Sequence, residues 1–559
     1  MNHTFQITGH IVDPLKQRIY DGTLIINDGR ITSILPAEDN LPSSFFNHQS
    51  NDDAPFILPG FIDSHVHIES SMLLPENFAH IAVQHGTVAA VADPHEIANV
   101  LGIEGIDFMI QNGRQVPFHF FFGAPSCVPC TYMESSGAII DADDIRALMQ
   151  RDDIGFLGEM MNMPGVLFGD KEVLEKLKAA RDAGKPIDGH APGLSGEELR
   201  HYAAESISTD HECSSLAEAQ AHIDDGMKVL IREGSAAQNF ESLSPLLASY
   251  ADELMFCTDD KHPDDLMKGH INLIVRRAVA KGYPLWNVLR AACVTPVLHY
   301  HLPCGLLQQG DSADFILVDS LTDFNVLATC IGGNLFNRYA QLPVSQSWKR
   351  DEWPNNFHAQ PIAPKDLHIA PESGNIHVIT AFNGSLFTGQ KTMKANIVEG
   401  NVISNVESDV LKIVVLNRYA PSQPAIGFIK GFGLRRGALA STIAHDSHNI
   451  VAVGTSDEAI ATAINHVIQL GGGIVVEDAE RYDALPLPIA GLISPLSAAD
   501  TAIAYARLTT RAKALGCVFD APFMTLSFMA LPVIPKLKMT DKGLFDTALF
   551  RHISPFVTN

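Results

Sequence analysis

Histidines and carboxylates stand at the ends of several short apolar runs in the first half of this sequence. One run ends in His65-Val66-His67, and later runs end at Glu159, His190, His211 and Asp259. Imidazole and carboxylate groups can bind divalent metal ions and can carry protons near neutral pH. Residues two apart in a strand lie on the same face, so both rings of the H-x-H pair could reach one ion. Taken alone, such a pair is equally consistent with two histidines in an ordinary loop.

The six run-end residues together predict a binuclear metal site. Two divalent ions could share them, with Glu159 as the bridging ligand. Imidazole nitrogens and carboxylate oxygens without a thiolate suit Zn, Mn or Fe. A purely structural explanation would require six run ends to carry potential ligands by accident. The predicted metal ligands are therefore His65, His67, Glu159, His190, His211 and Asp259.

Eight apolar runs, separated by segments of helical pattern, must position these residues. The runs are Ile57–Ile68, Gly86–His95, Val116–Ala124, Ile154–Asn162, Pro186–His190, Ile207–His211, Lys228–Ser235 and Glu253–Asp259. The amphipathic segment Lys171–Gly184 lies between two of them and ends on glycine, which predicts a helix. Eight strand–helix units predict an α/β fold with a TIM-type (β/α)8 barrel, whose active site lies at the carboxyl ends of the strands. A doubly wound sheet is the alternative, but it would not usually need eight consecutive units.

The sequence on either side of the barrel region predicts two further parts. Short alternating strands precede it, with a hairpin signal at Asn27-Asp28-Gly29, and strand character returns at 305–319. We therefore predict a small split β-sandwich domain (1–56 plus 305–345) around the barrel (57–304). A proline-rich linker at about 340–371 leads to a C-terminal α+β domain (371–559). Helices are expected in that domain at 456–469 and 497–515.

Composition excludes several classes of protein. The chain has 559 residues and a formal net charge of -25, which argues against nucleic acid as a partner. The eight cysteines are scattered, which argues against a disulfide framework. The N-terminus has no signal-peptide pattern, and no apolar stretch approaches the ~20 residues that span a bilayer. We expect a soluble, cytoplasmic protein with no membrane partner.

Longer motifs at the same strand ends resemble one family. The string Pro59-Gly60-Phe61-Ile62-Asp63-Ser64-His65-Val66-His67 resembles the first barrel strand of the amidohydrolase superfamily. Further motifs make the chain similar to the bacterial adenine deaminase family over residues 5 to about 555: Glu69-Ser70-Ser71-Met72, Ala92-Asp93-Pro94-His95-Glu96, Gly158-Glu159-Met160-Met161-Asn162, Asp188-Gly189-His190-Ala191-Pro192-Gly193, Cys257-Thr258-Asp259-Asp260 and Ala444-His445-Asp446-Ser447-His448-Asn449. Many superfamily members bridge their metals with a carboxylated lysine, and the matching residue here is Glu159.

The resemblance implies a reaction and a cofactor. It implies hydrolytic deamination of adenine, a small purine base, to hypoxanthine and ammonia, with a metal-bridged hydroxide attacking C6. In that reaction Glu159 is the bridging ligand and Asp259 is expected to transfer the proton. The resemblance favours two Mn²⁺ or Fe²⁺ ions, with Zn²⁺ as an alternative. It also suggests a homodimer or a larger homo-oligomer.

The resemblance also places five residues near the substrate. Glu69, His95 and Glu96 are expected near the barrel mouth, where one carboxylate could orient the purine. The His445–Asn449 loop, with His445 and His448, is expected to fold over that mouth, where it covers the purine or touches a metal. The alternative is a polar turn within the C-terminal domain.

Other interpretations of these patterns stay open or are weaker. The same metal pair could hydrolyse another nucleobase or a cyclic amide, because loops choose the substrate. A non-catalytic assembly partner is disfavoured by the six intact ligands. Cys127 and Cys130 form a C-x-x-C pair without the context of a redox or zinc site, so we interpret them as loop or packing residues. Gly471-Gly472-Gly473 precedes a strand and lacks a P-loop lysine, which predicts a helix stop.

Overall fold

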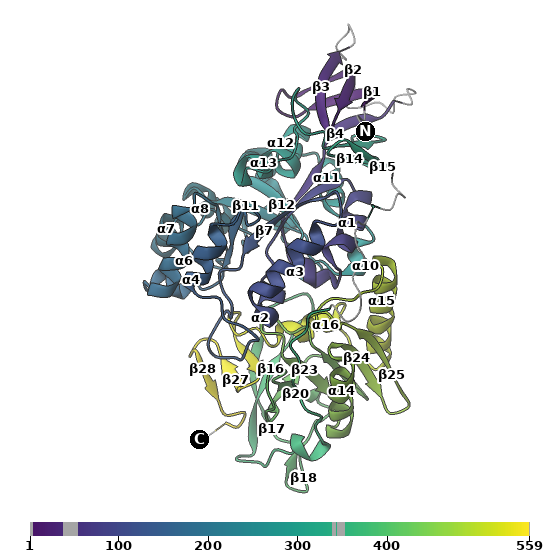
Figure 1. Cartoon of the computed structure of the whole chain (residues 1–559). Helices are drawn as coiled ribbons and strands as arrows, with labels where there is room; N and C mark the ends of the chain where they lie inside the picture. Colours follow the sequence, from purple (N-terminus) through teal and green to yellow (C-terminus); the bar gives the residue numbers. More distant parts are fainter. Residues whose placement is uncertain (1–3, 37–53, 338–341, 344–352, 558–559) are drawn as a thin grey trace.

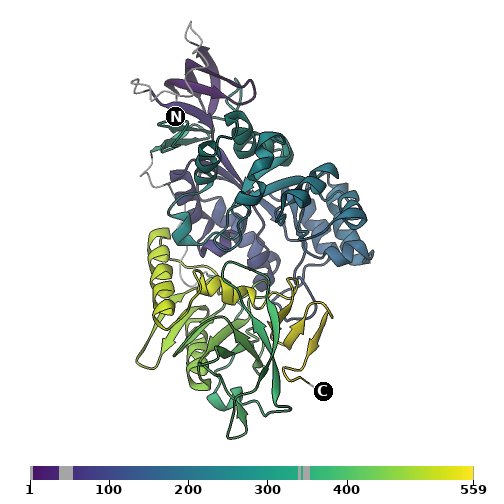
Figure 2. The ribbon, with the colours of Figure 1, turned by 180° about the vertical axis from the view of Figure 1, so that it is seen from behind.

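The chain folds into three parts stacked along one long axis (Figures 1 and 2). This computed structural model describes residues 4–36, 54–337, 342–343 and 353–557. Parts of two predicted regions lie outside the described residues. For the predicted linker at about 340–371 these are most of residues 340–352, and for the predicted split domain they are residues 1–3, 37–53, 338–341 and 344–345. A small β-sheet stands at one end, a barrel in the middle and a C-terminal domain at the other end.

The small sheet is built from segments on both sides of the barrel. Its seven strands follow the order β15-β14-β13-β4-β1-β2-β3. The predicted hairpin is confirmed, because β2 ends at Asn27, β3 begins at Arg30, and Asp28 and Gly29 between them both have positive φ. The strands are β1 (Thr4–Asp13), β2 (Arg18–Asn27), β3 (Arg30–Pro36), β4 (Phe56–Pro59), β13 (Phe315–Val318), β14 (Val326–Ile331) and β15 (Asn334–Asn337).

Eight parallel strands form the predicted barrel. Pairing runs from β5 to β9 and from β10 to β12. A backbone bond from Ser208 N to Ile187 O (2.9 Å) joins the two groups, and one from Asp259 N to His65 O (2.9 Å) closes the ring. The strands are β5 (Phe61–Val66), β6 (Thr87–Ala92), β7 (His119–Ala124), β8 (Phe156–Met160), β9 (Ile187–Gly189), β10 (Thr209–Asp210), β11 (Lys228–Arg232) and β12 (Leu254–Cys257).

The first predicted run, Ile57–Ile68, is two strands and not one. β4 belongs to the small sheet, where it pairs with β1 and β13, and β5 begins the barrel. Gly60 separates them at a point of close approach, since a Cβ there would lie 2.2 Å from a methyl group of Val88. The sequence shows one apolar run because both strands are fully buried.

Helices alternate with the barrel strands. The predicted helix at 171–184 is α6 (Lys171–Asp182), and Gly184 lies just past its end with φ of 66°. The Asp170 carboxylate accepts bonds from the first amides of α6, while Leu177 and Ala180 are buried. The other barrel helices of four residues or more include α1 (Pro75–Gln84), α2 (His95–Leu101), α3 (Ile103–Gly113), α4 (Ala142–Met149), α5 (Met163–Leu167), α7 (Gly196–Ala204), α8 (Leu216–Asp224), α10 (Pro263–Leu266), α11 (Ile271–Ala280) and α13 (Thr295–Tyr300).

The C-terminal domain is α+β, as predicted. Its main sheet has the order β17-β16-β21-β20-β23-β22-β24-β25. The predicted helices are α14 (Asp457–Leu470) and α15 (Ala498–Ala514), and Gly471 ends α14 in a left-handed conformation. The other elements of this domain include β16 (Asn375–Thr380), β17 (Gly389–Lys394), β20 (Val410–Leu416), β21 (Ala425–Lys430), β22 (Ala438–Ser441), β23 (Ile450–Gly454), β24 (Gly473–Asp478), β25 (Arg481–Pro486), α16 (Pro522–Phe528), β26 (Leu537–Thr540), β27 (Gly543–Asp546) and β28 (Arg551–Ile553).

The C-terminal domain covers the end of the barrel where the strands terminate. In Figure 1, α2 and α16 lie where the two parts meet. The loop between β22 and β23 reaches the barrel, where Asn449 Nδ2 donates to Ser135 O (2.7 Å). A second link runs from Ser494 N to Met72 O (2.9 Å). In the part of the chain that the structure describes, no helix has the length and hydropathy to cross a membrane.

Candidate metal centre

The barrel brings the six predicted ligands into one buried cluster. His65 lies in β5 and Glu159 in β8. His67, His190 and His211 directly follow β5, β9 and β10, and Asp259 lies two residues past the end of β12. Several combinations have ligand atoms within 4.8 Å of one another, including His65, Glu159 and His211. The described residues thus place these six side chains together at the carboxyl end of the barrel: His65, His67, Glu159, His190, His211 and Asp259.

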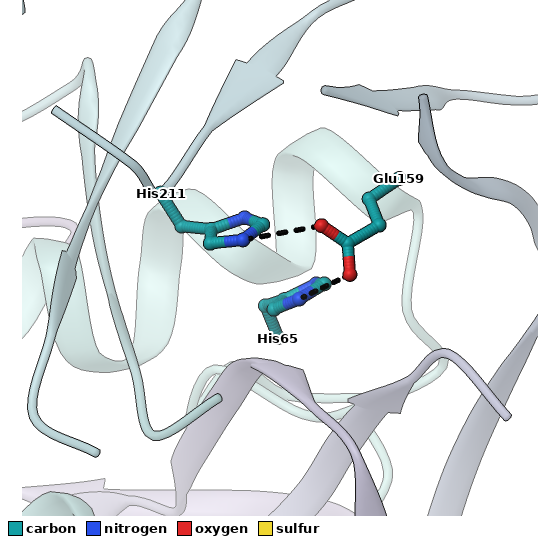
Figure 3. Close-up of side chains that lie close together, drawn as sticks. All are labelled: His65, Glu159 and His211. Atoms are coloured by element: carbon teal, nitrogen blue, oxygen red, sulfur yellow. Dashed lines mark ion pairs between the residues drawn. The ribbon is translucent and has the colours of Figure 1, made fainter. Parts of the chain in front are cut away.

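Glu159 lies between two pairs of histidines. Its Oε1 is 3.1 Å from His67 Nε2 and 3.8 Å from His65 Nε2. Its Oε2 is 2.7 Å from His190 Nδ1 and 3.3 Å from His211 Nε2. Figure 3 shows one oxygen directed toward His65 and the other toward His211. Because each oxygen faces a different pair, this carboxylate has the geometry of a bridging ligand.

Asp259 completes the cluster beside the first pair of histidines. Its Oδ1 is 3.2 Å from His67 Nε2 and 3.7 Å from His65 Nε2. Its Oδ2 accepts a bond of 2.7 Å from Arg232, whose guanidinium also pairs with Glu212. Arg232 is not predicted from the sequence, because an arginine at the end of a strand is not a metal-ligand signal.

The surroundings of His67 suit a cation. Its Nδ1 lies 3.0 Å from the carbonyl oxygen of Asp93, which can only accept, so Nδ1 carries a proton. Burial acts to lower the pKa of His67, but the carboxylates of Asp259 and Glu159, both within 3.2 Å of Nε2, outweigh it and raise the pKa well above its usual value. A divalent cation between these atoms would take the place of the proton on Nε2, and a histidine held by a backbone carbonyl is a common metal-ligand arrangement.

Both carboxylates remain ionised despite their burial. Burial acts to raise the pKa of Asp259, but Arg232 and the neighbouring histidines outweigh it and hold the pKa well below its usual value. Burial likewise acts to raise the pKa of Glu159, and His190 and His211 reverse the shift. Metal binding requires deprotonated ligands, so this charge state suits the proposed role.

The three barrel residues predicted near the substrate, Glu69, His95 and Glu96, differ in their position relative to the cavity. His95 and Glu96 line the cavity beside the cluster. Glu69 is not among the residues that line that cavity, and its Oε1 accepts a bond of 3.1 Å from Ile97 N in the first turn of α2. Burial raises the pKa of Glu69 to about 7. The structure therefore places Glu69 as a support of α2, apart from the cavity lining.

The C-terminal loop reaches the barrel mouth. The His445 and His448 rings both pair with the carboxylate of Glu96, although these residues lie about 350 positions away in the chain. The ring of His445 also stacks on Phe528, with centroids 4.5 Å apart. The sequence predicts that the loop either folds over the barrel mouth or is a polar turn within the C-terminal domain. These contacts agree with the first alternative.

The cavity has two chemically different walls. The barrel wall includes the ligands His67, Glu159, His190, His211 and Asp259, together with His95, Glu96, Met161, Glu212, Arg232 and Asp260. The C-terminal wall consists of Leu386, His445, Asp446, Phe528, Leu531 and Ile534. The first is dominated by groups that can bind metal, and the second is mostly apolar.

Comparisons with known proteins identify the class first. The Amidohydrolase family model matches residues 56–336, and the Adenine deaminase C-terminal domain model matches residues 385–551. The barrel and its strand-end ligands thus define an amidohydrolase. Within that class, the chain belongs to the adenine deaminase family.

Curated relatives are similar over the whole chain. The adenine deaminase of Salinibacter ruber is 49% identical over 559 residues, covering 100% of both chains. That of Parabacteroides distasonis is 46% identical and covers 99% of both chains. The adenine deaminase of Methanosarcina mazei is 46% identical, covering 98% of this chain and 99% of its own.

Proposed function

We propose that this protein is a metal-dependent hydrolase that deaminates adenine to hypoxanthine and ammonia. The observation that carries the proposal is the position of Glu159 between two histidine pairs, in a chain that matches adenine deaminases from end to end. Fold alone would not choose the substrate, whereas full-length similarity extends to the C-terminal wall.

Two divalent cations are the proposed cofactors. His65, His67 and Asp259 would hold one, His190 and His211 the other, and Glu159 would contact both. When bound, such ions lower the pKa of a coordinated water and supply hydroxide near neutral pH. Nitrogen and oxygen ligands without thiolate accept Mn²⁺, Fe²⁺ or Zn²⁺, and we propose Mn²⁺ or Fe²⁺ as the native pair.

Asp259 is the proposed proton carrier. Hydrolysis adds water at C6 and expels ammonia, so a proton must leave the water and protons must reach N1 and the amino group. Asp259 Oδ1 faces the cluster while Arg232 fixes Oδ2, so one carboxylate oxygen is directed toward the place where the water would be bound. A carboxylate held in this way can take the proton from water and return it to the purine.

The proposal is tested by loading the purified protein with Mn²⁺, Fe²⁺ or Zn²⁺ and measuring ammonia release. Adenine should be the preferred substrate among adenine, cytosine, guanine and adenosine. Absence of release from adenine with every metal would overturn the proposal. Release from cytosine or guanine at a higher kcat/KM would assign the site to another nucleobase.

We also propose that the protein is a cytoplasmic homo-oligomer, at least a dimer, with no nucleic-acid or membrane partner. A net charge of -25 supports a small neutral substrate over a polyanion. Light scattering on the metal-loaded protein would test the assembly, and a monomer at micromolar concentration would contradict it.

A further inference from the structure

Two buried polar atoms in the C-terminal wall have no hydrogen-bond partner among the described residues. They are Nε2 of His445 and Oδ2 of Asp446. Both residues line the cavity, and each is only 2% exposed. Buried polar atoms are normally paired, so unpaired atoms beside a candidate active site indicate a ligand that pairs with them.

The opposite side of the His445 ring is fixed by Glu96. His448 Nδ1 accepts a bond of 3.2 Å from Ala444 N, so the proton of the neutral His448 ring is on Nε2 and is donated to Glu96. The Nδ1 of His445 donates to the other oxygen of the same carboxylate. Glu96 thereby holds both rings and fixes the direction in which His445 Nε2 points.

The two unpaired atoms form a donor and an acceptor. Burial acts to lower the pKa of His445, but the charges of Glu96 and Asp260 outweigh it and raise the pKa to about 9. With Nδ1 directed at the Glu96 carboxylate, Nε2–H is a donor in the charged ring, which the nearby carboxylates of Glu96 and Asp260 favour. Asp446 Oδ1 lies 3.9 Å from His95 Nε2, which leaves Oδ2 as a free acceptor.

Adenine presents the complementary pair on its far edge. The reacting carbon, C6, must face the barrel wall, where the proposed metals lie. The ring atom opposite C6 is N3, an acceptor, and the adjacent position outside that ring is N9–H, a donor. This edge consequently faces the C-terminal wall, while Phe528, Leu531 and Ile534 supply apolar surface for the ring.

We propose that His445 donates to N3 of adenine and that Asp446 accepts from N9–H, so that the C-terminal domain selects a purine without a substituent at N9. The inference rests on the proposed function and deepens it. A site built to bond an N–H group discriminates strongly against an analogue that lacks the group, since its buried partner is then left unpaired. Adenosine and 9-methyladenine lack N9–H and would lose the hydrogen bond to Asp446. The analogue 3-deazaadenine lacks N3 and would lose the hydrogen bond from His445.

The experiment pairs each residue with one atom of the substrate. The metal-loaded wild type, Asp446→Ala and His445→Gln are compared on adenine, 9-methyladenine, 3-deazaadenine and 7-deazaadenine. Ser447→Ala is the matched control, because Ser447 is a buried residue of the same loop that does not line the cavity. Metal content is measured for every variant, so that loss of metal is separated from loss of recognition.

Each pair should couple specifically. In the wild type, 9-methyladenine and 3-deazaadenine should lose kcat/KM by on the order of 10²-fold or more relative to adenine. Asp446→Ala should reduce the penalty on 9-methyladenine at least about tenfold, and His445→Gln should do so for 3-deazaadenine, with Ser447→Ala unchanged. The altered electronic structure of the 3-deazaadenine ring slows its reaction in every variant. The test is therefore the change, between wild type and variant, in the ratio of kcat/KM for adenine to kcat/KM for the analogue.

Three results would overturn the inference. The penalties could persist in the variants, both analogues could match adenine in the wild type, or 7-deazaadenine could suffer the loss that is coupled to His445. The wild-type series alone decides if a variant does not fold. Failure of the wild type to deaminate adenine would instead refute the proposed function, so the two failures are distinguishable.

Discussion

The two walls of the cavity differ in charge, in origin and in what they can do. The barrel wall gathers metal-binding groups around Glu159 from strands that are rigid and parallel. The C-terminal wall is mostly apolar, and a single loop gives it two polar side chains, His445 and Asp446. The contrast indicates a division of labour, in which the barrel performs the chemistry and the C-terminal domain chooses the substrate.

The walls are also held together differently. Strand ends hold the barrel wall, and Arg232 fixes its charge by pairing with Asp259 and Glu212. The C-terminal wall depends on one carboxylate, Glu96, which joins two domains through two histidines. Changes to the barrel wall should therefore reduce metal content and activity, whereas changes to the other wall should spare the metals.

The largest effect is expected from Glu159→Gln. An amide cannot offer two anionic oxygens to two cations, so the variant should lose metal and lower kcat/KM for adenine on the order of 10⁴-fold or more. Metal analysis and ammonia release measure both. Glu198→Gln, on the exposed face of α7, is the matched control and should behave as wild type. Two bound metals with activity within tenfold of wild type would contradict a bridging role.

A smaller but still large effect is expected from Arg232→Met. The change leaves Asp259 and Glu212 buried without their partner, which typically costs about 3–5 kcal/mol of stability. Urea unfolding should show this loss, and kcat should fall with it. Arg232→Lys should recover part of both, because the charge returns without the two-sided geometry. Unchanged stability in Arg232→Met would mean that the ion pairs do not hold this wall.

The barrel wall is also the part that sequence predicts best. The carboxyl ends of all strands in a (β/α)8 barrel lie at the same face, so His65, Glu159 and Asp259 could be grouped into one site from the sequence alone. Arg232 was missed because its role is to neutralise ligands and not to be one. The resemblance predicts Glu69 near the barrel mouth, and the structure adds that its Oε1 accepts a bond from the amide of Ile97 in α2.

The C-terminal wall could be predicted only in outline. The His445–Asn449 motif marked the loop, but nothing in the local pattern pairs His445 and His448 with Glu96, because that contact depends on how two domains dock. The same limit applied at Gly60, where burial on both sides hides the boundary between β4 and β5. Local sequence periodicity predicts helices and strands, whereas contacts between distant segments depend on how these elements pack.

Glu96→Gln sharpens the comparison between the walls. The variant removes the charge that holds His445 and His448, so the His445–Asn449 loop should become more mobile while the barrel ligands stay in place. We expect kcat/KM for adenine to fall about 10²-fold, within the range for losing a charged hydrogen-bond partner. Two metals should remain bound, and hydrogen exchange should rise in the loop. Loss of metal equal to that of Glu159→Gln would erase the distinction between the walls.

The smallest expected effect is a pH dependence of stability from His448. Burial lowers its pKa to about 4, below the 6.5 of an exposed imidazole. Between pH 6.5 and 4 the unfolded chain binds a proton that the folded chain does not, so this residue reduces stability as the pH falls through that range and has no such effect above it. Relative to His448→Gln, the wild type should lose roughly 1–2 kcal/mol between pH 7.5 and pH 5. Urea unfolding at both values measures the gap, with His201→Gln on the exposed face of α7 as control. A wild type that instead gained stability relative to His448→Gln as the pH fell would show that Glu96 keeps His448 charged in the folded protein, and the C-terminal wall would then carry more charge than its contacts indicate.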